Sequence, residues 1–236
     1  RILHGAQWVE PPEKRNLPVT YYGPRSGLGV ALSVLRPESP RRLGMVGLGA
    51  GTLAAYGKAG DVVRFYEINP HVLKIAREQF HFLNESPARV EVAIADARLS
   101  LEREPPQGFD LLAIDAFSGD AIPTHLLSAE ALDLYLRHLK PDGAILFHVT
   151  NRYLNLAPVV AKLAASRGLR ALLISEEPTD EQEEDLYYSS SDWVVVTRDE
   201  ALLAHPDLAQ VAKEIEVSES TPLWTDDFNN LVRILK

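Results

Sequence analysis

Short apolar runs alternate with helical segments from residue 41 almost to the end of the chain. The second run, for example, is followed by Asn69 and Pro70, a common helix cap and a residue that fits the first helical turn. Strands that alternate with helices usually form a parallel sheet covered on both faces. The sequence therefore predicts an α/β fold with a mostly parallel seven-stranded sheet, with strands at residues 42–46, 62–68, 90–95, 109–114, 144–149, 169–174 and 193–197.

Residues 1–40 differ in character, because they combine Pro and Gly with short β-like runs at 19–22 and 30–35. We expect a small N-terminal β-hairpin region over residues 1–40 and one Rossmann-like domain over residues 41–236. The chain has 236 residues and is 46% hydrophobic, which suffices for one sizeable core.

Composition excludes several kinds of site and partner. The chain has no Cys, which excludes disulfides, thiolate metal sites and cysteine nucleophiles. A formal charge of −9 argues against a broad nucleic-acid surface. No apolar run reaches the roughly 18–20 residues of a membrane span, so none is expected in this chain. Because the sequence begins at Arg1 rather than Met, the possibility stays open that a longer parent protein has a segment upstream of it.

A glycine-rich loop, GLGAG, follows the first expected strand and opens a helix. Gly47, Gly49 and Gly51 would let the backbone turn tightly and approach a ligand closely. Glu67 ends the next strand, where a carboxylate can accept hydrogen bonds from both hydroxyls of a ribose. The alternative interpretation is that Glu67 is simply an exposed acid at the end of a strand. Together the loop and Glu67 favour a nucleoside-binding site.

Two further acids, Asp96 and Asp115, follow the third and fourth expected strands. Asp96 suits either an adenine amino group or a helix cap. Ligands of open α/β sheets bind beyond the carboxyl ends of the strands, where all these residues fall. NAD and FAD stay open, but their fingerprint spaces the glycines as GxGxxG. The pattern better suits one adenine nucleoside, such as S-adenosylmethionine or its decarboxylated form.

The loop after the fourth strand carries Asp115 and Asp120, which would place negative charge where a cationic amine meets a sulfonium. Asp120 could equally cap a turn. His148 and Asn151 follow the fifth strand and suit either acceptor binding or a structural role. Asp226 and its neighbour Asp227 could line the same pocket, or follow a helix cap as first-turn acids. The acid-rich stretch 176–185 is expected as a solvated loop, or as an acidic lip near a cationic substrate.

Several motifs together resemble the spermidine synthase family of aminopropyltransferases, and especially the spermidine-synthase-like domains fused to membrane-transporter-like segments. The motifs are HGAQ (4–7), GLGAG (47–51), YEINPHVLKIAR (66–77), ADAR (95–98), FDLLAIDAFSGDAIP (109–123), LKPDGAILFHVTNR (139–152) and TDDFNN (225–230). The resemblance implies a Rossmann-like adenosylmethionine-dependent transferase fold that moves an aminopropyl group from decarboxylated S-adenosylmethionine to an amine such as putrescine. No metal is expected, because a sulfonium leaves without help.

The resemblance also assigns roles to residues. Gln7 and the loop glycines would hold the donor, Glu67 its ribose, and Asp96 with Ala97 its adenine. Asp115 would sit at the reaction centre. Tyr22 is expected to bind substrate, but Tyr21 and Tyr22 could equally close over the donor or pack the hairpin. The resemblance implies a cytoplasmic location, or tethering to the inner face of a membrane if the chain is a fusion fragment. A homodimer is left open.

Three departures from the family pattern affect recognition of the amine. The family's loop has an Asp that contacts the donor's ammonium, where this chain has Ala50. Its Tyr-His/Gln-Glu motif is Tyr22-Gly23-Pro24 here, and its D-x-x-D-P is a longer D-x-x-x-x-D. An adenosylmethionine-dependent methyltransferase and a non-catalytic adenosyl-binding module therefore remain alternatives.

Overall fold

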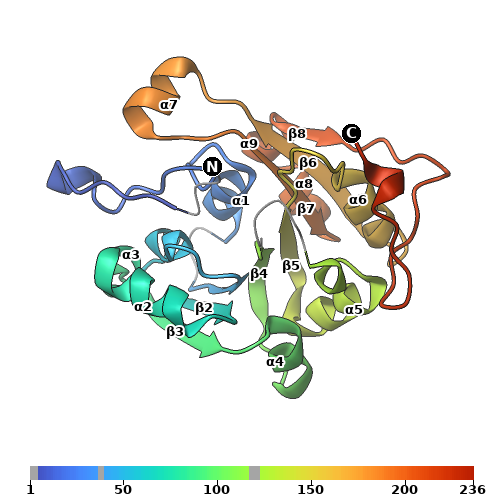
Figure 1. Cartoon of the computed structure of the whole chain (residues 1–236), viewed down its shortest axis with the longest axis horizontal. Coiled ribbons are helices and arrows are strands. Elements are labelled where there is room, and N and C mark those ends of the chain that lie inside the picture. Colours follow the sequence, from blue (N-terminus) through green and yellow to red (C-terminus); the bar gives the residue numbers. More distant parts are fainter. Residues whose placement is uncertain (1–4, 37–39, 117–122) are drawn as a thin grey trace.

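The computed structural model describes residues 5–36, 40–116 and 123–236, and across them one eight-stranded sheet forms the centre (Figure 1). The strand order is β3-β2-β1-β4-β5-β7-β6-β8. The strands are β1 (Arg42–Val46), β2 (Val62–Glu67), β3 (Arg89–Ile94), β4 (Phe109–Ile114), β5 (Leu139–His148), β6 (Arg170–Glu176), β7 (Ser191–Thr197) and β8 (Ala212–Glu214). Strands β1 to β5 are parallel, whereas β7 is antiparallel to both of its neighbours and β8 is antiparallel to β6. The α/β prediction is confirmed, but the strand number was wrong because the short β8 extends the sheet.

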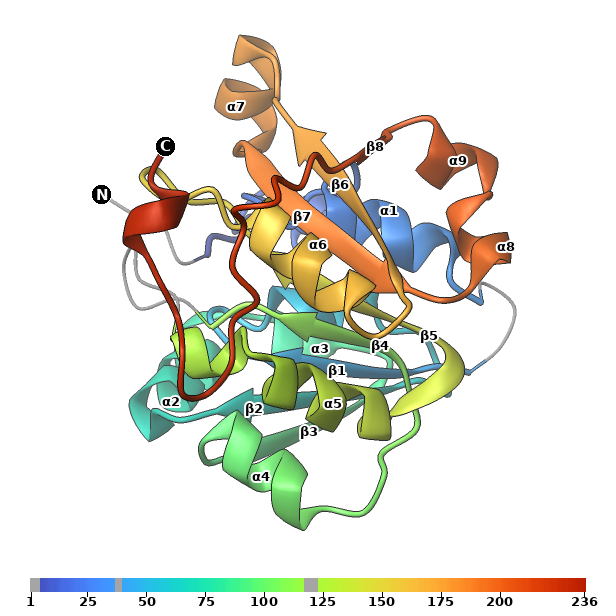
Figure 2. The ribbon, with the colours of Figure 1, turned by 90° about the vertical axis from the view of Figure 1, so that its right-hand side faces the viewer.

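Helices connect the strands and cover both faces of the sheet (Figure 2). The α-helices are α1 (Gly27–Val34), α2 (Pro70–Gln79), α3 (Phe82–Glu85), α4 (Ala97–Arg103), α5 (Ala129–His138), α6 (Ala157–Ala165), α7 (Asp180–Leu186), α8 (Glu200–Leu203) and α9 (Pro206–Ala209). Single 3-10 turns are η1 (Pro12–Lys14), η2 (Thr52–Tyr56), η3 (Thr124–Leu126) and η4 (Val232–Ile234). As expected, Asn69 and Ser128 cap α2 and α5, each accepting a backbone N–H.

Alternate residues of the strands supply two separate cores, because successive side chains point to opposite faces of a sheet. Met45 of β1 belongs to the core under α1, η2 and α3, whereas its neighbour Val46 belongs to the core under α4, α5 and α6. Trp224, near the C-terminus, is fully buried in this second core. The C-terminal segment is therefore packed against the same helices that follow the central strands.

The N-terminal β-hairpin prediction was wrong for the described residues. Residues 30–35, expected to be β-like, lie mostly in α1, and the strand-like pairing in this region is an isolated bridge between Thr20 and Tyr188. Helix α1 forms because Ser26 caps it and its apolar residues bury against β6 and β7. A Cβ on Gly27 would lie 2.4 Å from the Cβ of Trp193, so only glycine permits this approach. The division into residues 1–40 and 41–236 stays a prediction.

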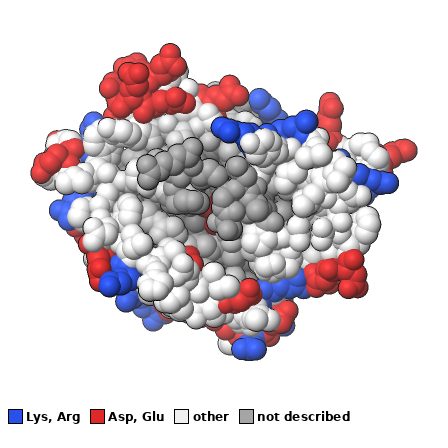
Figure 3. Space-filling model, in the orientation of Figure 1, with Lys and Arg blue, Asp and Glu red and all other residues white. Residues whose placement is uncertain are grey.

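Two further segments differ from expectation. Residues 139–143, which precede the expected strand at 144–149, belong to β5, and β5 pairs with β4 across a register shift. Most of the acid-rich stretch 176–185 is helical rather than a loop, because Thr179 and Gln182 form a capping box that starts α7 at Asp180. Acids in the first turn also suit the positive end of a helix. Figure 3 shows the resulting acidic cluster over α7. None of the helices in the described ranges is long and apolar enough to cross a bilayer.

Candidate active site

The candidate site lies where the strand order reverses, between β1 and β4. The chain leaves β1 toward β2 and β3 and then returns to β4 on the other side of β1, which creates the crevice in which open α/β sheets bind ligands. Gly47 follows β1 with a φ of 96°, and a Cβ there would lie 2.2 Å from the backbone oxygen of Asp115. Glycine at this position therefore lets the loop and the end of β4 meet.

A cavity of about 670 Å³ opens at this crevice, within the usual size range of small-molecule sites. Seven of the residues predicted from sequence line it, and they come from the glycine loop and from the ends of β2, β3 and β4, together with the N-terminal region. They are Tyr22, Gly47, Gly49, Glu67, Asp96, Ala97 and Asp115. The structure thus brings the predicted nucleoside-binding acids into one cavity.

Glu67 is buried, with a relative exposure of 8%, and its carboxylate is held by the backbone on both sides. Oε2 accepts from the N–H of Leu48 at 3.1 Å, and Oε1 accepts from the N–H of Asn69 at 2.8 Å. A carboxylate offers about four lone-pair sites, so two remain for a ligand. The alternative of an exposed strand-end acid is wrong, and a role in binding two hydroxyls stays a prediction.

We expect Glu67→Gln to weaken binding of S-adenosylhomocysteine by about 1–3 kcal/mol, the range for hydrogen bonds to charged groups. The amide presents N–H groups where the carboxylate accepted, so it opposes either a ligand hydroxyl or a loop N–H. Isothermal calorimetry measures the affinity, and a thermal melt checks the fold. An unchanged affinity in a folded variant would remove Glu67 from the site.

Asp96 lies at the start of α4, and its two carboxylate oxygens have different neighbours. Its Oδ1 accepts from the N–H of Leu99 at 3.0 Å, so the helix-cap alternative is confirmed. Its Oδ2 lies 3.8 Å from Nε2 of His125, and both residues line the cavity. Capping occupies one oxygen and leaves the other beside the cavity, so adenine binding by Asp96 stays a prediction compatible with the cap.

Asp115 is the centre of a buried polar network. Its Oδ2 accepts from the hydroxyl of Tyr22, and its Oδ1 lies 2.8 Å from Nδ1 of His148. Thr150 Oγ1 accepts from the N–H of Asp192 at 2.8 Å, so its own hydroxyl can donate to Nε2 of His148 at 2.7 Å. Nδ1–H then donates to Asp115. With this arrangement of donors and acceptors, each of these groups has a hydrogen-bond partner when Asp115 is a carboxylate.

Aromatic rings surround this network. The imidazole of His148 is stacked between Tyr21 and Trp193, with ring centroids 4.8 and 4.5 Å away. Burial, together with the charge of Asp115, raises the pKa of the Tyr22 hydroxyl well above its usual value. Tyr22 therefore stays a proton donor to Asp115. The carboxylate is held rigidly and reaches the cavity only through its remaining lone pairs.

Other predicted residues lie away from the cavity lining. Gln7 links its side chain to Gln79 and His81, and Asn151 accepts from two N–H groups of its own turn. His148 contacts Asp115 and is not among the lining residues, which favours the structural alternative, so acceptor binding by His148 stays a prediction. Asp120 lies outside the described residues, so its role stays a prediction.

Asp226 fits neither of its two expected positions. It does not line the cavity, and no helix begins behind Thr225. Its carboxylate instead binds the guanidinium of Arg98 and the hydroxyl of Ser128. Among the described side chains, no group of three or more His, Asp or Glu residues could hold a metal ion.

Sequence reasoning missed the apolar wall of the cavity and His125. Ile68 and Ile75 line the cavity with relative exposures of 69% and 53%, which is unusual for large aliphatic residues. Helical periodicity assigns Ile75 to a core-facing side of α2, so periodicity alone could not reveal this position. No local sequence signal indicated that His125 lines the cavity, because its position depends on tertiary packing rather than on neighbouring residues.

Glu176, at the end of β6, is buried at 7% exposure, and neither of its carboxylate oxygens has a hydrogen-bond partner among the residues that the structure describes. Burial raises the pKa of this carboxyl to about 7. The hydroxyl of Ser191, on the paired position of β7, also lacks a partner. Ionisation of the Glu176 carboxyl therefore lowers the stability of the folded chain.

We expect a pH dependence of stability from Glu176. Since its native pKa is raised, the folded chain keeps a proton that the unfolded chain loses between about pH 4.5 and 7. The unfolding free energy should fall as pH rises through this window, by up to about 3 kcal/mol. Glu176→Gln should remove that slope in urea titrations at pH 5 and pH 8. Glu177→Gln, an exposed neighbour, is the control. Equal slopes in both variants would contradict the prediction.

Comparison with known proteins shows which sequences and folds this chain resembles. No protein-family model matches the sequence. The chain is 31% identical over 147 residues to the polyamine aminopropyltransferase of Vibrio vulnificus (strain CMCP6), a match that covers 59% of this chain and 46% of that protein. Human methyltransferase-like protein 13, solved in complex with SAH, superposes with a TM-score of 0.59 at 21% identity over 81% of this chain and 93% of that chain. A probable spermidine synthase from Corynebacterium glutamicum ATCC 13032 gives 0.55 at 17%, over 81% and 80%.

The chain has the fold of S-adenosylmethionine-dependent methyltransferases and spermidine synthases. This confirms the expected Rossmann-like transferase fold. The aminopropyltransferase match also confirms the resemblance to the spermidine synthase family, although it spans less than half of that relative's length. The matched proteins are transferases, which is the class predicted from sequence.

Proposed function

We propose that this chain transfers an aminopropyl group from decarboxylated S-adenosylmethionine to a small amine such as putrescine. The observation that carries the proposal is Asp115, a carboxylate lining a nucleoside-sized cavity and held between Tyr22 and His148. Its matched relative is named a polyamine aminopropyltransferase, and the structural neighbour solved with SAH supports an adenosyl ligand.

The reaction needs an unprotonated amine aligned with a carbon beside the sulfonium. An alkylamine has a pKa of about 10, as in Lys, so it arrives mostly charged at neutral pH. Asp115 would attract the ammonium, accept one of its protons and orient the nitrogen lone pair. That lone pair forms the new C–N bond while the C–S bond breaks. The electron pair of the C–S bond stays on sulfur, and methylthioadenosine is the leaving group. Tyr22 and His148 would hold the carboxylate in place.

The cavity residues fit an adenosyl donor. The glycine loop approaches Asp115 without a side chain, Glu67 keeps free lone pairs for the two ribose hydroxyls, and Asp96 keeps one oxygen for the base amino group. The exposed Ile75 offers an apolar surface on which a base can lie. These features support donor binding without selecting between the two donors.

A methyltransferase that uses S-adenosylmethionine itself is the second candidate, and Ala50 favours it. Ala50 lines the cavity and is buried at 4% exposure, with its methyl group against Gly5. The acid that selects the decarboxylated donor in the spermidine synthase family is therefore replaced by an uncharged wall. The carboxylate of ordinary S-adenosylmethionine would meet no repulsion from this position.

One experiment separates the candidates. The chain is incubated with each donor and a panel of amines, and the products are identified by mass spectrometry. Methylthioadenosine together with an aminopropylated amine supports the proposal, whereas S-adenosylhomocysteine supports the methyltransferase. Binding of both donors without turnover would contradict both and leave an adenosyl-binding module. Location in the cell and assembly into dimers stay predictions.

A further inference from the structure

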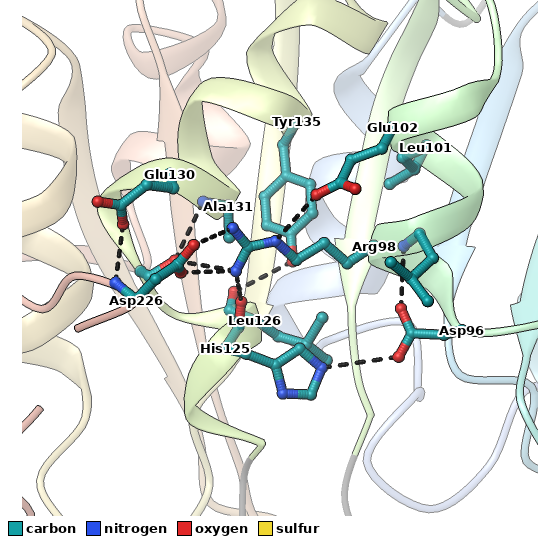
Figure 4. Close-up of polar contacts among 12 residues, drawn as sticks. Asp96, Arg98, Leu101, Glu102, His125, Leu126, Glu130, Ala131, Tyr135 and Asp226 are labelled. Carbon is teal, nitrogen blue, oxygen red and sulfur yellow. Dashed lines mark hydrogen bonds and ion pairs between the residues drawn. The ribbon is translucent and has the colours of Figure 1, made fainter. Parts of the chain in front are cut away.

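The C-terminal segment contacts Arg98, close to the cavity residues Asp96 and His125, although it is far from them in sequence. Figure 4 shows Arg98 between Asp226 on one side and the His125–Leu126 turn on the other. Arg98 lies two residues after Asp96, the acid predicted to bind adenine. The start of α4, the 3-10 turn η3 and the C-terminal segment therefore meet at one place.

Arg98 joins these segments through its guanidinium. Nη1 donates to Oδ1 of Asp226 at 2.6 Å, and Nη2 donates to Oδ2, so the pair is bidentate. The same Nη1 donates to the backbone oxygen of His125 at 2.8 Å. The hydrogen bonds from Arg98 lower the pKa of the Asp226 carboxyl, so it stays ionised near neutral pH. A bidentate pair fixes orientation as well as distance.

Asp226 is itself held in position on the far side. The hydroxyl of Ser128 donates to its Oδ1 at 2.6 Å, and its backbone N–H donates to Glu130 at 3.0 Å. Two residues earlier, Trp224 is fully buried, and its carbonyl accepts from the N–H of Ala129. The C-terminal segment is thus anchored to α5, and Asp226 is a fixed point against which Arg98 is placed.

The position of the His125 ring depends on its own backbone. Arg98 holds the carbonyl of His125, and the hydroxyl of Tyr135 holds the next carbonyl, that of Leu126, at 3.1 Å. The side chain of His125 is half exposed, lines the cavity and lies 3.8 Å from the free oxygen of Asp96. Since the side chain of His125 rotates about this held backbone, the position of the backbone limits how far the ring can lie from Asp96.

We infer that Asp226 is a positioning residue for nucleobase recognition, acting through Arg98 on the backbone of His125. The ligand class is a nucleoside whose base carries an exocyclic amino group, which can donate to Asp96. This inference rests on the proposed adenosyl-binding function. It gives the C-terminal segment a part in the site although no residue of this segment is in the cavity lining.

The test compares two ligands that differ only at the base edge, S-adenosylhomocysteine and its inosine analogue, in which an oxygen replaces the amino group. Calorimetry gives the affinity ratio. Wild type should prefer the adenosine form, because the inosine oxygen cannot donate to a carboxylate. Asp226→Asn should reduce that ratio by about threefold to tenfold, the size of one net hydrogen bond. His125→Ala should reduce it similarly, and combining both changes should add little.

Asp133→Asn is the matched control. Asp133 makes a bidentate pair with Arg167, at 2.6 and 2.8 Å, in the middle of α5, and neither residue lines the cavity. Both variants should lower the melting temperature, but only Asp226→Asn should change the ratio. An equal ratio in both variants would overturn the inference and leave the proposed function intact. Wild type that binds neither ligand would overturn both.

Discussion

Asp115→Asn should keep the affinity for the donor and lower turnover by about 10²–10⁴-fold, the contribution typical of a positioned acid or base. The amide is neutral, so it neither attracts the ammonium nor accepts its proton. It also cannot accept from Tyr22 and His148 on both sides, because one of its ends carries N–H groups. Single-turnover assays with the productive donor and amine measure the chemical step, and calorimetry measures donor binding.

Two control variants test whether this result is specific to Asp115. Tyr22→Phe keeps the ring but removes the hydroxyl donor, so it should lower turnover less than Asp115→Asn does. Asp133→Asn, far from the cavity, should leave turnover unchanged. If Asp115→Asn lost the donor and retained its maximal rate, Asp115 would be a donor-binding residue and the proposed mechanism would be wrong.

The second large effect concerns Ala50 and the choice of donor. Decarboxylated S-adenosylmethionine ends in an ammonium and lacks the carboxylate of the ordinary form. An Asp at this position attracts the first group and repels the second, and Ala does neither. A charge pair at about 4 Å with an effective dielectric of about 20 is worth up to about 4 kcal/mol before desolvation. Ala50→Asp should therefore shift preference toward the decarboxylated donor by about tenfold to a hundredfold.

Titration of both donors into both proteins measures this shift. Wild type should bind them within about a hundredfold of each other, by the same estimate. Ala50→Asn is the control, since it adds similar bulk beside Gly5 without charge. A strong wild-type preference for the decarboxylated donor that Ala50→Asp leaves unchanged would place the selecting charge elsewhere in the cavity.

The sequence by itself determined the central α/β pattern and three acids that line the cavity. Glu67, Asp96 and Asp115 could be predicted because each lies at the carboxyl end of a strand, and parallel strands end at one edge of a sheet. Local signals also located helix starts, as at Asn69 and Ser128, because a cap depends on a few neighbouring residues. These features need no knowledge of distant contacts.

Tertiary structure alone decided the N-terminal region and the surroundings of the acids. The run at 30–35 has β-like residues, yet it is largely helical because Gly27 lets α1 pack on Trp193. His148 follows a strand as a ligand-binding residue would, but stacking between two rings places it behind Asp115. Asp226 binds Arg98 across 128 positions of sequence. Its local pattern fitted a helix cap as well as a pocket, and only the packing of Trp224 against α5 determined where its carboxylate lies.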